Sequence, residues 1–356
     1  MGHAAIAHSY AALLGKHGYD AIAVDVFHYD HGNDICGAIA LHFRGLKSVP
    51  WAWRSLYRRW PAIPGSHWFK TDLMPIRFRR TRDYLMRSNP SLIVTTHPLA
   101  TAIVSLLKRR GAVHSQLVVA FFNWNVQPFW MFPKVDGYLV ATERQAQALV
   151  SCGIPRDTVA HVGILVDEWY YGEQDPMQCR RMIGVPENRP SLLVMSGGTA
   201  WRMEDFIRVI CQLECAATVY VLGVGDDLKP QLELLIRTRL RGPVTIRLLG
   251  CTDARPYFSA VDAVLTKPGI SVAEGLAIGI PTIVAFPVPG HDELALVELL
   301  ASEPIATLPG GRQGAFLEQI LTHASTWKLK ERNESRQAAR ECPRRVMEAI
   351  ERWSGD

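Results

Sequence analysis

Residues 266–281 read TKPGISVAEGLAIGIP and join one apolar segment, Asp262 to Leu265, to another, Pro281 to Phe286. The pattern predicts a strand, a Pro-Gly turn, a helix and a second strand. The free backbone N–H groups and the positive dipole end of such a helix point at one place, which makes an anion site. Glu274 follows about one helical turn later, where a carboxylate can accept hydrogen bonds from a ribose diol. The stretch therefore predicts a nucleotide site; the alternative is an ordinary strand–turn–helix connection.

Strands and helices alternate on both sides of this stretch. In the second half we expect strands at 191–195, 218–223 and 244–249 and helices at 203–214, 228–240 and 292–301. In the first half we expect helices at 4–16, 100–110 and 143–151 and strands at 19–27, 91–95, 116–122, 137–141 and 158–162. Regular alternation predicts an α/β fold with two doubly wound, Rossmann-like domains facing a cleft.

A polar segment with no clear period, residues 168–189, divides the alternation into two halves. We predict an N-terminal domain at 1–167, a junction at 168–189, a C-terminal domain at 190–312 and a charged helical tail at 313–356. The 356 residues suffice for two domains, each with its own core.

Composition indicates a globular protein, because hydrophobic residues make up 48% and charged residues only 21% of the chain. The seven cysteines are scattered without paired metal spacing, which favours reduced thiols in a cytosolic protein. No signal peptide is evident, and no apolar run reaches the roughly 20 residues needed to cross a bilayer. We expect a cytoplasmic protein whose membrane contact is peripheral, on the cytoplasmic face.

Basic and aromatic residues alternate between Phe43 and Arg87. Eleven Lys or Arg side chains lie there, opposed by Asp72 and Asp83 alone. Cations that meet lipid head groups and indoles that settle at the interface suit an anionic bilayer. Packing of these aromatics on their own domain, or binding of nucleic acid, are the alternatives. We expect membrane and acceptor contacts, and not nucleic acid, at Trp51, Trp53, Arg58, Arg59, Trp60 and Trp68.

The 266–281 stretch, with Pro-Val-Pro-Gly at 287–290, resembles the donor-site segment of the diacylglycerol glycosyltransferases. That family includes the monogalactosyldiacylglycerol synthases and the processive diacylglycerol glucosyltransferases, and is related to the transferase that adds GlcNAc to make lipid II. Further similarities follow in order along the chain: Gly2-His3, Thr96-His97-Pro98, Trp130, Ser196-Gly197-Gly198 and Asp262. The resemblance implies a GT-B fold whose C-terminal half holds the nucleotide of a UDP-sugar.

The resemblance also implies roles for individual residues. His3 becomes the candidate base, since a helix N-terminus lowers an imidazole's pKa and favours its proton-accepting form. His97, after a strand, becomes a second catalytic candidate that orients the acceptor. His291 replaces a family Gln near the donor hexose. The implied donor-binding residues are Gly197, Gly198, Lys267, Pro268, Gly269, Ile270, Ser271, Glu274, Gly290, His291 and Asp292.

The chain departs from the family pattern in several places. Ala120 stands where the family has Asp, and Gln127 where it has His. Ile270 stands where a second Gly is usual. The family also has a strand and a glycine loop before the position of His3, so we expect the true start to lie upstream of Met1. These departures suggest altered acceptor chemistry or lost activity.

The sequence thus predicts an inverting glycosyltransferase that moves a hexose from a UDP-sugar to a membrane lipid such as diacylglycerol. Oriented amides would hold the diphosphate, and no Asp-x-Asp motif is present to bind a metal, so we expect neither metal nor cofactor. One alternative is a catalytically degenerate protein that binds a nucleotide or a membrane. Another is a transferase acting on a soluble secondary metabolite. The sequence does not indicate the sugar or the oligomeric state.

Overall fold

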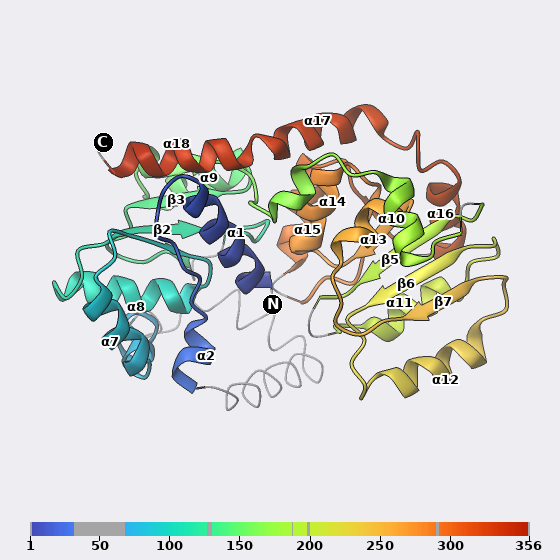
Figure 1. Ribbon diagram of the computed structural model, residues 1–356, viewed down its shortest axis with the longest axis horizontal. Coiled ribbons are helices and arrows are strands. Elements are labelled where there is room, and N and C mark those ends of the chain that lie inside the picture. Colours follow the sequence, from blue (N-terminus) through green and yellow to red (C-terminus); the bar gives the residue numbers. More distant parts are fainter. Residues whose placement is uncertain are drawn as a thin grey trace. The chain divides into compact units, whose positions relative to one another are not determined.

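The computed structural model describes residues 2–31, 68–126, 130–186, 188–197, 200–289 and 292–354. Its internal contacts divide the chain into two compact units. The N-terminal unit contains residues 3–167, 289–294 and 341–356, and the C-terminal unit contains 1–2, 168–288 and 295–340. Each unit is built around a parallel sheet, as predicted for an α/β fold (Figure 1).

The sheet of the N-terminal unit has the order β1-β2-β3-β4, and all its neighbouring strands are parallel. Its strands are β1 (Leu92–Thr95), β2 (Gln116–Ala120), β3 (Gly137–Val140) and β4 (Val159–His161). The connecting helices are α8 (Pro98–Arg109) and α9 (Glu143–Ser151), and α1 (Gly2–Lys16) precedes the sheet. Strands β2 and β3 are almost wholly buried, in keeping with the apolar runs that parallel sheets require.

The predicted strand at Tyr19–Phe27 is wrong. Residues 19–25 have no regular structure, and Val26–His31 form helix α2. Asp25 explains the change, because its Oδ1 accepts hydrogen bonds from Phe27 N (2.9 Å) and His28 N (3.2 Å). A carboxylate that satisfies the first free amides favours a helix start over a strand.

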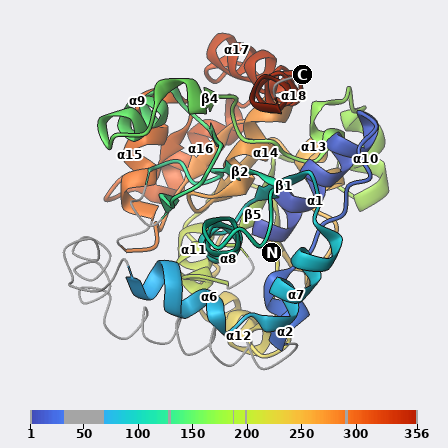
Figure 2. The same ribbon diagram turned by 90° about the vertical axis from the view of Figure 1, so that its left-hand side faces the viewer.

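The described end of the basic aromatic segment is helical. It forms a π-helix, η2 (Phe69–Leu73), then α6 (Met74–Ile76) and α7 (Arg79–Ser88). Helix α7 starts on a carboxylate from a distant part of the chain, since Asp30 accepts bonds from Arg80 N (2.8 Å) and Thr81 N (3.0 Å). Helices α2 and α7 consequently lie side by side (Figure 2).

The sheet of the C-terminal unit has the order β10-β9-β8-β5-β6-β7, entirely parallel. When the six strands are numbered 1 to 6 along the chain and the sheet is followed from β7 to β10, the order is 3-2-1-4-5-6, as in dinucleotide-binding folds. The strands are β5 (Ser191–Met195), β6 (Thr218–Leu222), β7 (Thr245–Leu248), β8 (Ala263–Thr266), β9 (Thr282–Val284) and β10 (Ala306–Thr307). The helices are α11 (Met203–Ile210), α12 (Lys229–Arg239), α13 (Arg255–Ala260), α14 (Ile270–Ile278), α15 (Asp292–Ser302), α16 (Gln313–Thr322) and α17 (Leu329–Arg340).

The polar segment 168–189 contains regular structure that the sequence analysis missed. A 3-10 helix, η5 (Glu168–Tyr171), is followed by α10 (Pro176–Ile183). Asp175 caps α10 by accepting a bond from Met177 N (2.9 Å), and Gly184 ends it with a positive φ of 68°. An Asp-Pro pair at the start and a Gly at the end are ordinary helix signals, so both ends of α10 could have been predicted from the sequence although its apolar residues show no clear period.

The last helix, α18 (Cys342–Ser354), packs on the N-terminal unit. The Trp353 indole donates to the Asp157 carbonyl (2.9 Å), and its ring lies so close to Gly137 that a Cβ at that position would collide with it. Beyond Trp353, the Ser354 hydroxyl donates to the Gln116 side chain (3.0 Å). Helix α18 therefore completes the unit that begins with His3.

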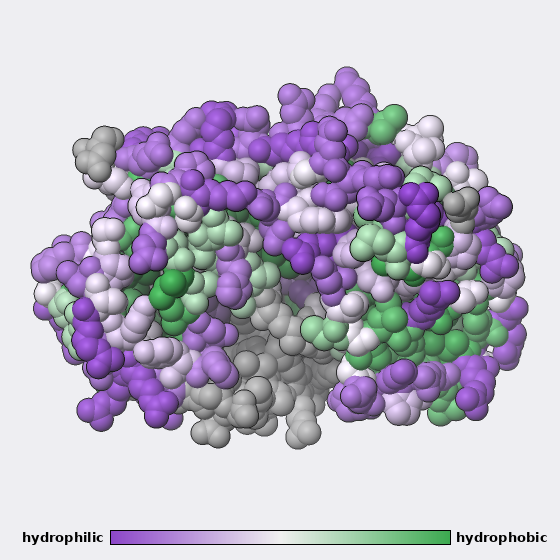
Figure 3. Space-filling model, viewed as in Figure 1, coloured by the Kyte–Doolittle hydropathy of each residue, from purple (hydrophilic) through white to green (hydrophobic). Residues whose placement is uncertain are grey.

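A groove between α12 and the edge strand β7 is lined by the apolar residues Ile236, Ile246 and Leu248 and by the charged residues Lys229, Glu233 and Arg237, in a region of the C-terminal unit where Figure 3 shows hydrophobic residues gathered. In the part of the chain that the structure describes, no helix combines the length and the hydrophobicity needed to span a bilayer.

Candidate functional site

The switch point of the C-terminal sheet lies between β5 and β8. These strands are neighbours, and their last residues, Met195 and Thr266, are paired in register. The chain turns out of the sheet after both of them, toward α11 and α14 respectively. Ligands of doubly wound sheets bind at this point of the carboxyl edge. The structure thus brings together two predicted donor-binding segments, the one after Ser196 and the one after Thr266.

Lys267 connects the two turns. A Cβ on Gly197 would lie 3.0 Å from Lys267 Cε, so the lysine stem runs directly over this glycine. Gly197 also has a φ of 74°, in the region that favours glycine. Lys267 Nζ donates to the Pro268 carbonyl (3.3 Å) and lies 3.5 Å from where a Cβ of Gly269 would be. The ammonium group is therefore held at the start of α14.

Helix α14 starts without a side-chain cap on Gly269, its N-cap residue. Val272 N donates to the Gly269 carbonyl (3.2 Å), so the helical bonding begins at this glycine. Amides at such a start, with the helix dipole behind them, attract phosphate oxygens. Of the predicted donor residues in the helix, Ser271 is buried, whereas Ile270 and Glu274 are half-buried. Pro268, in the turn, is buried.

Glycines follow four neighbouring strands of this sheet within four residues of each strand end: Gly197, Gly223, Gly250 and Gly269. Gly223 N donates to the Gly250 carbonyl (3.1 Å), and a Cβ on Gly223 would lie 4.0 Å from the Gly197 carbonyl oxygen. At these four positions the carboxyl edge presents main-chain atoms, with the Lys267 side chain over Gly197, and a ligand can approach the backbone closely.

Ser196 is a residue of this site that the sequence analysis did not assign. It follows β5 directly and is 0% exposed, and its hydroxyl has no hydrogen-bond partner within the described structure. A buried hydroxyl without a partner is unfavourable, which suggests that a ligand supplies one. Its signal in the sequence was a small polar residue at the end of the first strand of the second half.

The remaining donor residues are placed only in part. Gly198, Gly290 and His291 lie outside the described residues. Asp292 begins α15 and is 2% exposed.

The structure brings the two predicted catalytic histidines together in the N-terminal unit. Their ring centroids lie 4.5 Å apart. His3 Nδ1 donates to the Thr96 carbonyl, and the Thr96 hydroxyl donates back to the His3 carbonyl (3.0 Å). Because the proton of a neutral His3 is then on Nδ1, its Nε2 carries the lone pair and is the atom that can accept a proton.

His97 is fixed in the opposite tautomer. It is the N-cap residue of α8, and its Nδ1 accepts a hydrogen bond from Leu99 N (3.1 Å). Its own proton is therefore on Nε2, which is a donor. Burial, and next the positive charge that His3 can carry, lower the pKa of His97 to about 3. His97 thus stays neutral at physiological pH.

Aromatic rings enclose the histidine pair. Phe122 lies edge-on to His3, with centroids 4.4 Å apart, and Trp130 stacks on it at 6.4 Å. Phe27 meets His97 at 5.0 Å. These rings reduce hydration of the imidazoles and strengthen electrostatic interactions at the site.

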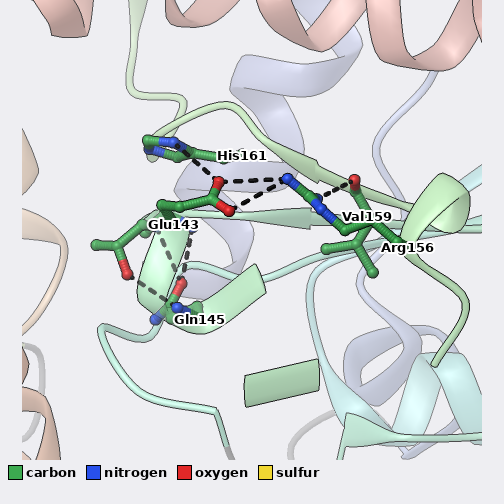
Figure 4. Close-up of polar contacts among 7 residues, drawn as sticks. Glu143, Gln145, Arg156, Val159 and His161 are labelled. Carbon is green, nitrogen blue, oxygen red and sulfur yellow. Dashed lines mark hydrogen bonds and ion pairs between the residues drawn. The ribbon is translucent and has the colours of Figure 1, made fainter. Parts of the chain in front are cut away.

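The polar cluster after β3 has a structural role (Figure 4). Gln145 forms a capping box with Thr142 at the start of α9 and also donates to the Asn123 carbonyl (2.7 Å). Nearby, Glu143 accepts from Arg156 (3.2 Å) and lies 4.0 Å from His161. The Glu143–Arg156 pair is about half exposed and therefore contributes at most about 1 kcal/mol. Gln145 has the larger consequence, because it anchors the loop that follows β2.

The predicted membrane residues Trp51, Trp53, Arg58, Arg59 and Trp60 lie outside the described residues. Trp68 is described and 59% exposed. The exposed apolar and basic side chains that follow it are Ile76, Arg77, Arg79, Arg80, Met86 and Arg87; the acidic Asp83 and the polar Ser88 and Asn89 are exposed as well.

Lys70, one of the eleven basic residues between Phe43 and Arg87, is buried and does not belong to a cationic surface. It is 6% exposed, donates to the Met131 carbonyl (2.9 Å) and lies 4.1 Å from the Phe132 ring centroid. Burial lowers its pKa to about 8. The aromatic face and the carbonyl of its neighbours hold this ammonium inside the unit.

Comparisons with known proteins confirm the resemblance to the diacylglycerol glycosyltransferases. The family model "Monogalactosyldiacylglycerol (MGDG) synthase" matches residues 4–166. A processive diacylglycerol beta-glucosyltransferase of Staphylococcus saprophyticus is 27% identical over 266 residues, 72% of this chain and 65% of the relative. One from Bacillus thuringiensis is 22% identical over 218 residues, 60% of this chain and 55% of the relative. The chain thus spans somewhat over half the length of these relatives.

Solved structures agree on the fold. Anabaena HepE in complex with UDP superposes with a TM-score of 0.54 at 14% identity, covering 77% of this chain and 81% of HepE. MurG of Acinetobacter baumannii superposes with a TM-score of 0.52 at 12% identity, covering 78% of each chain. Both are GT-B glycosyltransferases, so the predicted GT-B fold is confirmed.

Proposed function

We propose that this chain transfers a hexose from a UDP-sugar to a membrane lipid acceptor such as diacylglycerol, with inversion at the anomeric carbon. The observation that carries the proposal is the β5–β8 switch point, where Gly197, Lys267 and the start of α14 meet. The names of the relatives, which act on diacylglycerol, and the UDP complex of a GT-B neighbour support it.

The C-terminal unit binds the donor in this proposal. The first amides of α14 and the Lys267 ammonium hold the diphosphate, whose negative charge grows as the bond from the anomeric carbon to the phosphate oxygen breaks. The electron pair of that bond leaves with UDP. Glu274, one turn into the helix, accepts hydrogen bonds from the ribose. Because chain-borne positive groups meet the leaving group, the step needs neither a metal nor a cofactor.

The N-terminal unit activates the acceptor. His3 Nε2 takes the proton of the attacking hydroxyl as its oxygen bonds to the anomeric carbon on the face opposite to UDP. His97, neutral and donating through Nε2, orients the acceptor beside it. The tautomers fixed by the Thr96 carbonyl and the Leu99 amide support these two roles, one as proton acceptor and the other as hydrogen-bond donor.

Membrane contact is peripheral and on the cytoplasmic face in this proposal. The exposed Trp68, Ile76 and Met86 side chains, with arginines between them, suit an anionic lipid surface. Replacing both Arg79 and Arg80 with Glu is expected to weaken binding to anionic liposomes at low salt and to have little effect at high salt. Replacing Lys229 and Arg237 of α12 with Glu is the matched control.

The deciding experiment measures UDP release from UDP-glucose, UDP-galactose and UDP-GlcNAc in the presence of anionic liposomes with and without diacylglycerol. We expect release that depends on diacylglycerol. Tight UDP binding without release would favour a degenerate binding protein, for which the buried methyl group of Ala120 at the end of β2 is the specific observation. Release with small hydroxylated compounds alone would favour a soluble acceptor.

A further inference from the structure

We infer that Asn125 is an acceptor-binding residue whose side-chain amide hydrogen-bonds the hydroxyl-bearing head group of the acceptor. The inference rests on the proposed function and adds a contact that decides acceptor specificity. Asn125 is 7% exposed, and both of its side-chain amide atoms, Oδ1 and Nδ2, have no hydrogen-bond partner within the described structure.

An unpaired buried amide is costly. A buried polar group left without partners is unfavourable, and Asn125 leaves a donor and an acceptor unsatisfied together. Native proteins rarely keep such groups unless a ligand or an ordered water completes them. A hydroxyl is the simplest complement, because it donates to Oδ1 and its oxygen, or a neighbouring oxygen, accepts from Nδ2.

The position of Asn125 in the fold places it where the acceptor is expected. It belongs to the loop that leaves the carboxyl end of β2, the edge at which ligands of parallel sheets bind. Strand β2 ends in Ala120, which offers only a buried methyl group. The first polar side chains after this strand are therefore those of the loop itself.

The same loop borders the histidine pair. Phe122 and Trp130, on either side of Asn125 along the chain, both contact the His3 ring. The Gln145 side chain holds the loop by donating to the Asn123 carbonyl, two residues before Asn125. The amide is thus carried on an anchored segment, which favours a preorganised contact over an adaptable one.

Ser115 offers a matched control within the same element. It precedes β2 at the opposite, amino end of the strand, is 1% exposed, and its hydroxyl also has no partner within the described structure. If the lack of a partner had only a structural meaning, replacing Asn125 or Ser115 would have the same effect on acceptor binding, namely none. A ligand contact would distinguish Asn125 from Ser115.

The test compares Asn125→Leu, Asn125→Ala and Ser115→Ala with the wild type. The KM for dioleoylglycerol in anionic vesicles, the Kd for UDP by calorimetry and the melting temperature are measured. Both Asn125 variants are expected to raise the KM about tenfold, as loss of one or two hydrogen bonds predicts, and to leave UDP binding unchanged. The melting temperature should not fall, because the amide has no partner to lose. Ser115→Ala should leave the KM unchanged.

Two results would overturn the inference: an unchanged KM in both Asn125 variants, or a lowered melting temperature with weaker UDP binding, which marks a structural role. If the wild type releases no UDP at all, the proposed function fails, and binding of dihexanoylglycerol measured by NMR then decides on Asn125. Binding that Asn125→Leu abolishes would support the inference. Equal binding by both proteins, or none by the wild type, would refute it.

Discussion

The carboxyl edges of the two sheets present different chemistry. In the C-terminal unit, the carboxyl edge of the sheet is marked by backbone at Gly197 and at Gly269, the N-cap residue of α14, with the Lys267 side chain close to both glycines. The N-terminal edge consists of side chains, namely His3 and His97 enclosed by aromatic rings. A backbone edge suits a charged group common to many donors, whereas a side-chain edge suits proton transfer and discrimination between acceptors.

The largest expected effect separates chemistry from donor binding. Changing His3 to Ala should lower kcat about 100-fold to 10,000-fold, because a positioned base contributes this much to proton transfer, and should leave the Kd for UDP unchanged. Steady-state UDP release and calorimetry measure the two quantities. His8, exposed on the same helix α1, provides the control in His8→Ala. A weaker UDP affinity in His3→Ala would contradict the assignment of donor binding to the C-terminal unit alone.

The next effect tests the donor edge. Changing Lys267 to Met should weaken UDP binding about tenfold to 100-fold, since hydrogen bonds to charged groups contribute about 1.5–3 kcal/mol. Titration calorimetry at two salt concentrations would also show a smaller salt dependence than in the wild type. The control is Lys229→Met at the exposed start of α12, which removes one positive charge as Lys267→Met does but lies away from the switch point. Equal losses in both variants would point to a long-range charge effect.

A smaller effect concerns Ser196. Ser196→Ala should weaken UDP binding about fivefold to tenfold and at the same time raise the melting temperature slightly, because the free protein loses a buried hydroxyl without a partner. Ser115→Ala should show the stabilisation alone. Thermal unfolding without UDP measures the stability of the free protein, and the increase in melting temperature on adding UDP measures its affinity. A Ser196→Ala protein that is less stable without UDP would show that the hydroxyl has a structural role.

The smallest effect concerns stability and the buried Lys70. Its pKa is lowered from 10.5 to about 8, so between these values the unfolded chain binds more protons at this site than the folded one. Stability contributed by this group therefore rises as the pH increases from about 8 to 10.5. Lys70→Met should lack this rise, so the free energy of unfolding, measured with urea between pH 8 and 10.5, should increase less with pH than in the wild type. Parallel pH profiles would mean that Lys70 is hydrated in the native state.

Sequence reasoning succeeded where the determining interactions are local. The strand, turn and helix around Gly269 follow from a few adjacent residues, and β5 and β8 lie close to their predicted bounds. It was wrong for 19–27, where one carboxylate, Asp25, outweighs an apolar pattern typical of strands. It also missed α10, although Asp175 and Gly184 mark both of its ends.

Side-chain chemistry between distant segments was less accessible. His3 and Thr96, 93 residues apart, form two hydrogen bonds, and the one from His3 Nδ1 fixes the tautomer of His3. No local sequence pattern predicts these bonds. Asn125 and Ser196 are ordinary polar residues in the sequence. Only the fold shows that their polar atoms are buried without partners. The burial of Lys70 was likewise not evident from the sequence, because the carbonyl and the aromatic ring that surround it come from residues 131 and 132.

Helix α18 has a practical consequence for protein engineering. Since Trp353 fills the space beside Gly137, a fragment that stops at residue 167 would lack a piece of its own interior. The segment from 168 to 340 therefore resembles a cassette inserted into a host, apart from the short stretch at 289–294. Chimaeras that exchange donor preference between relatives should graft this cassette and keep the host's final helix, rather than join two halves at a single crossover.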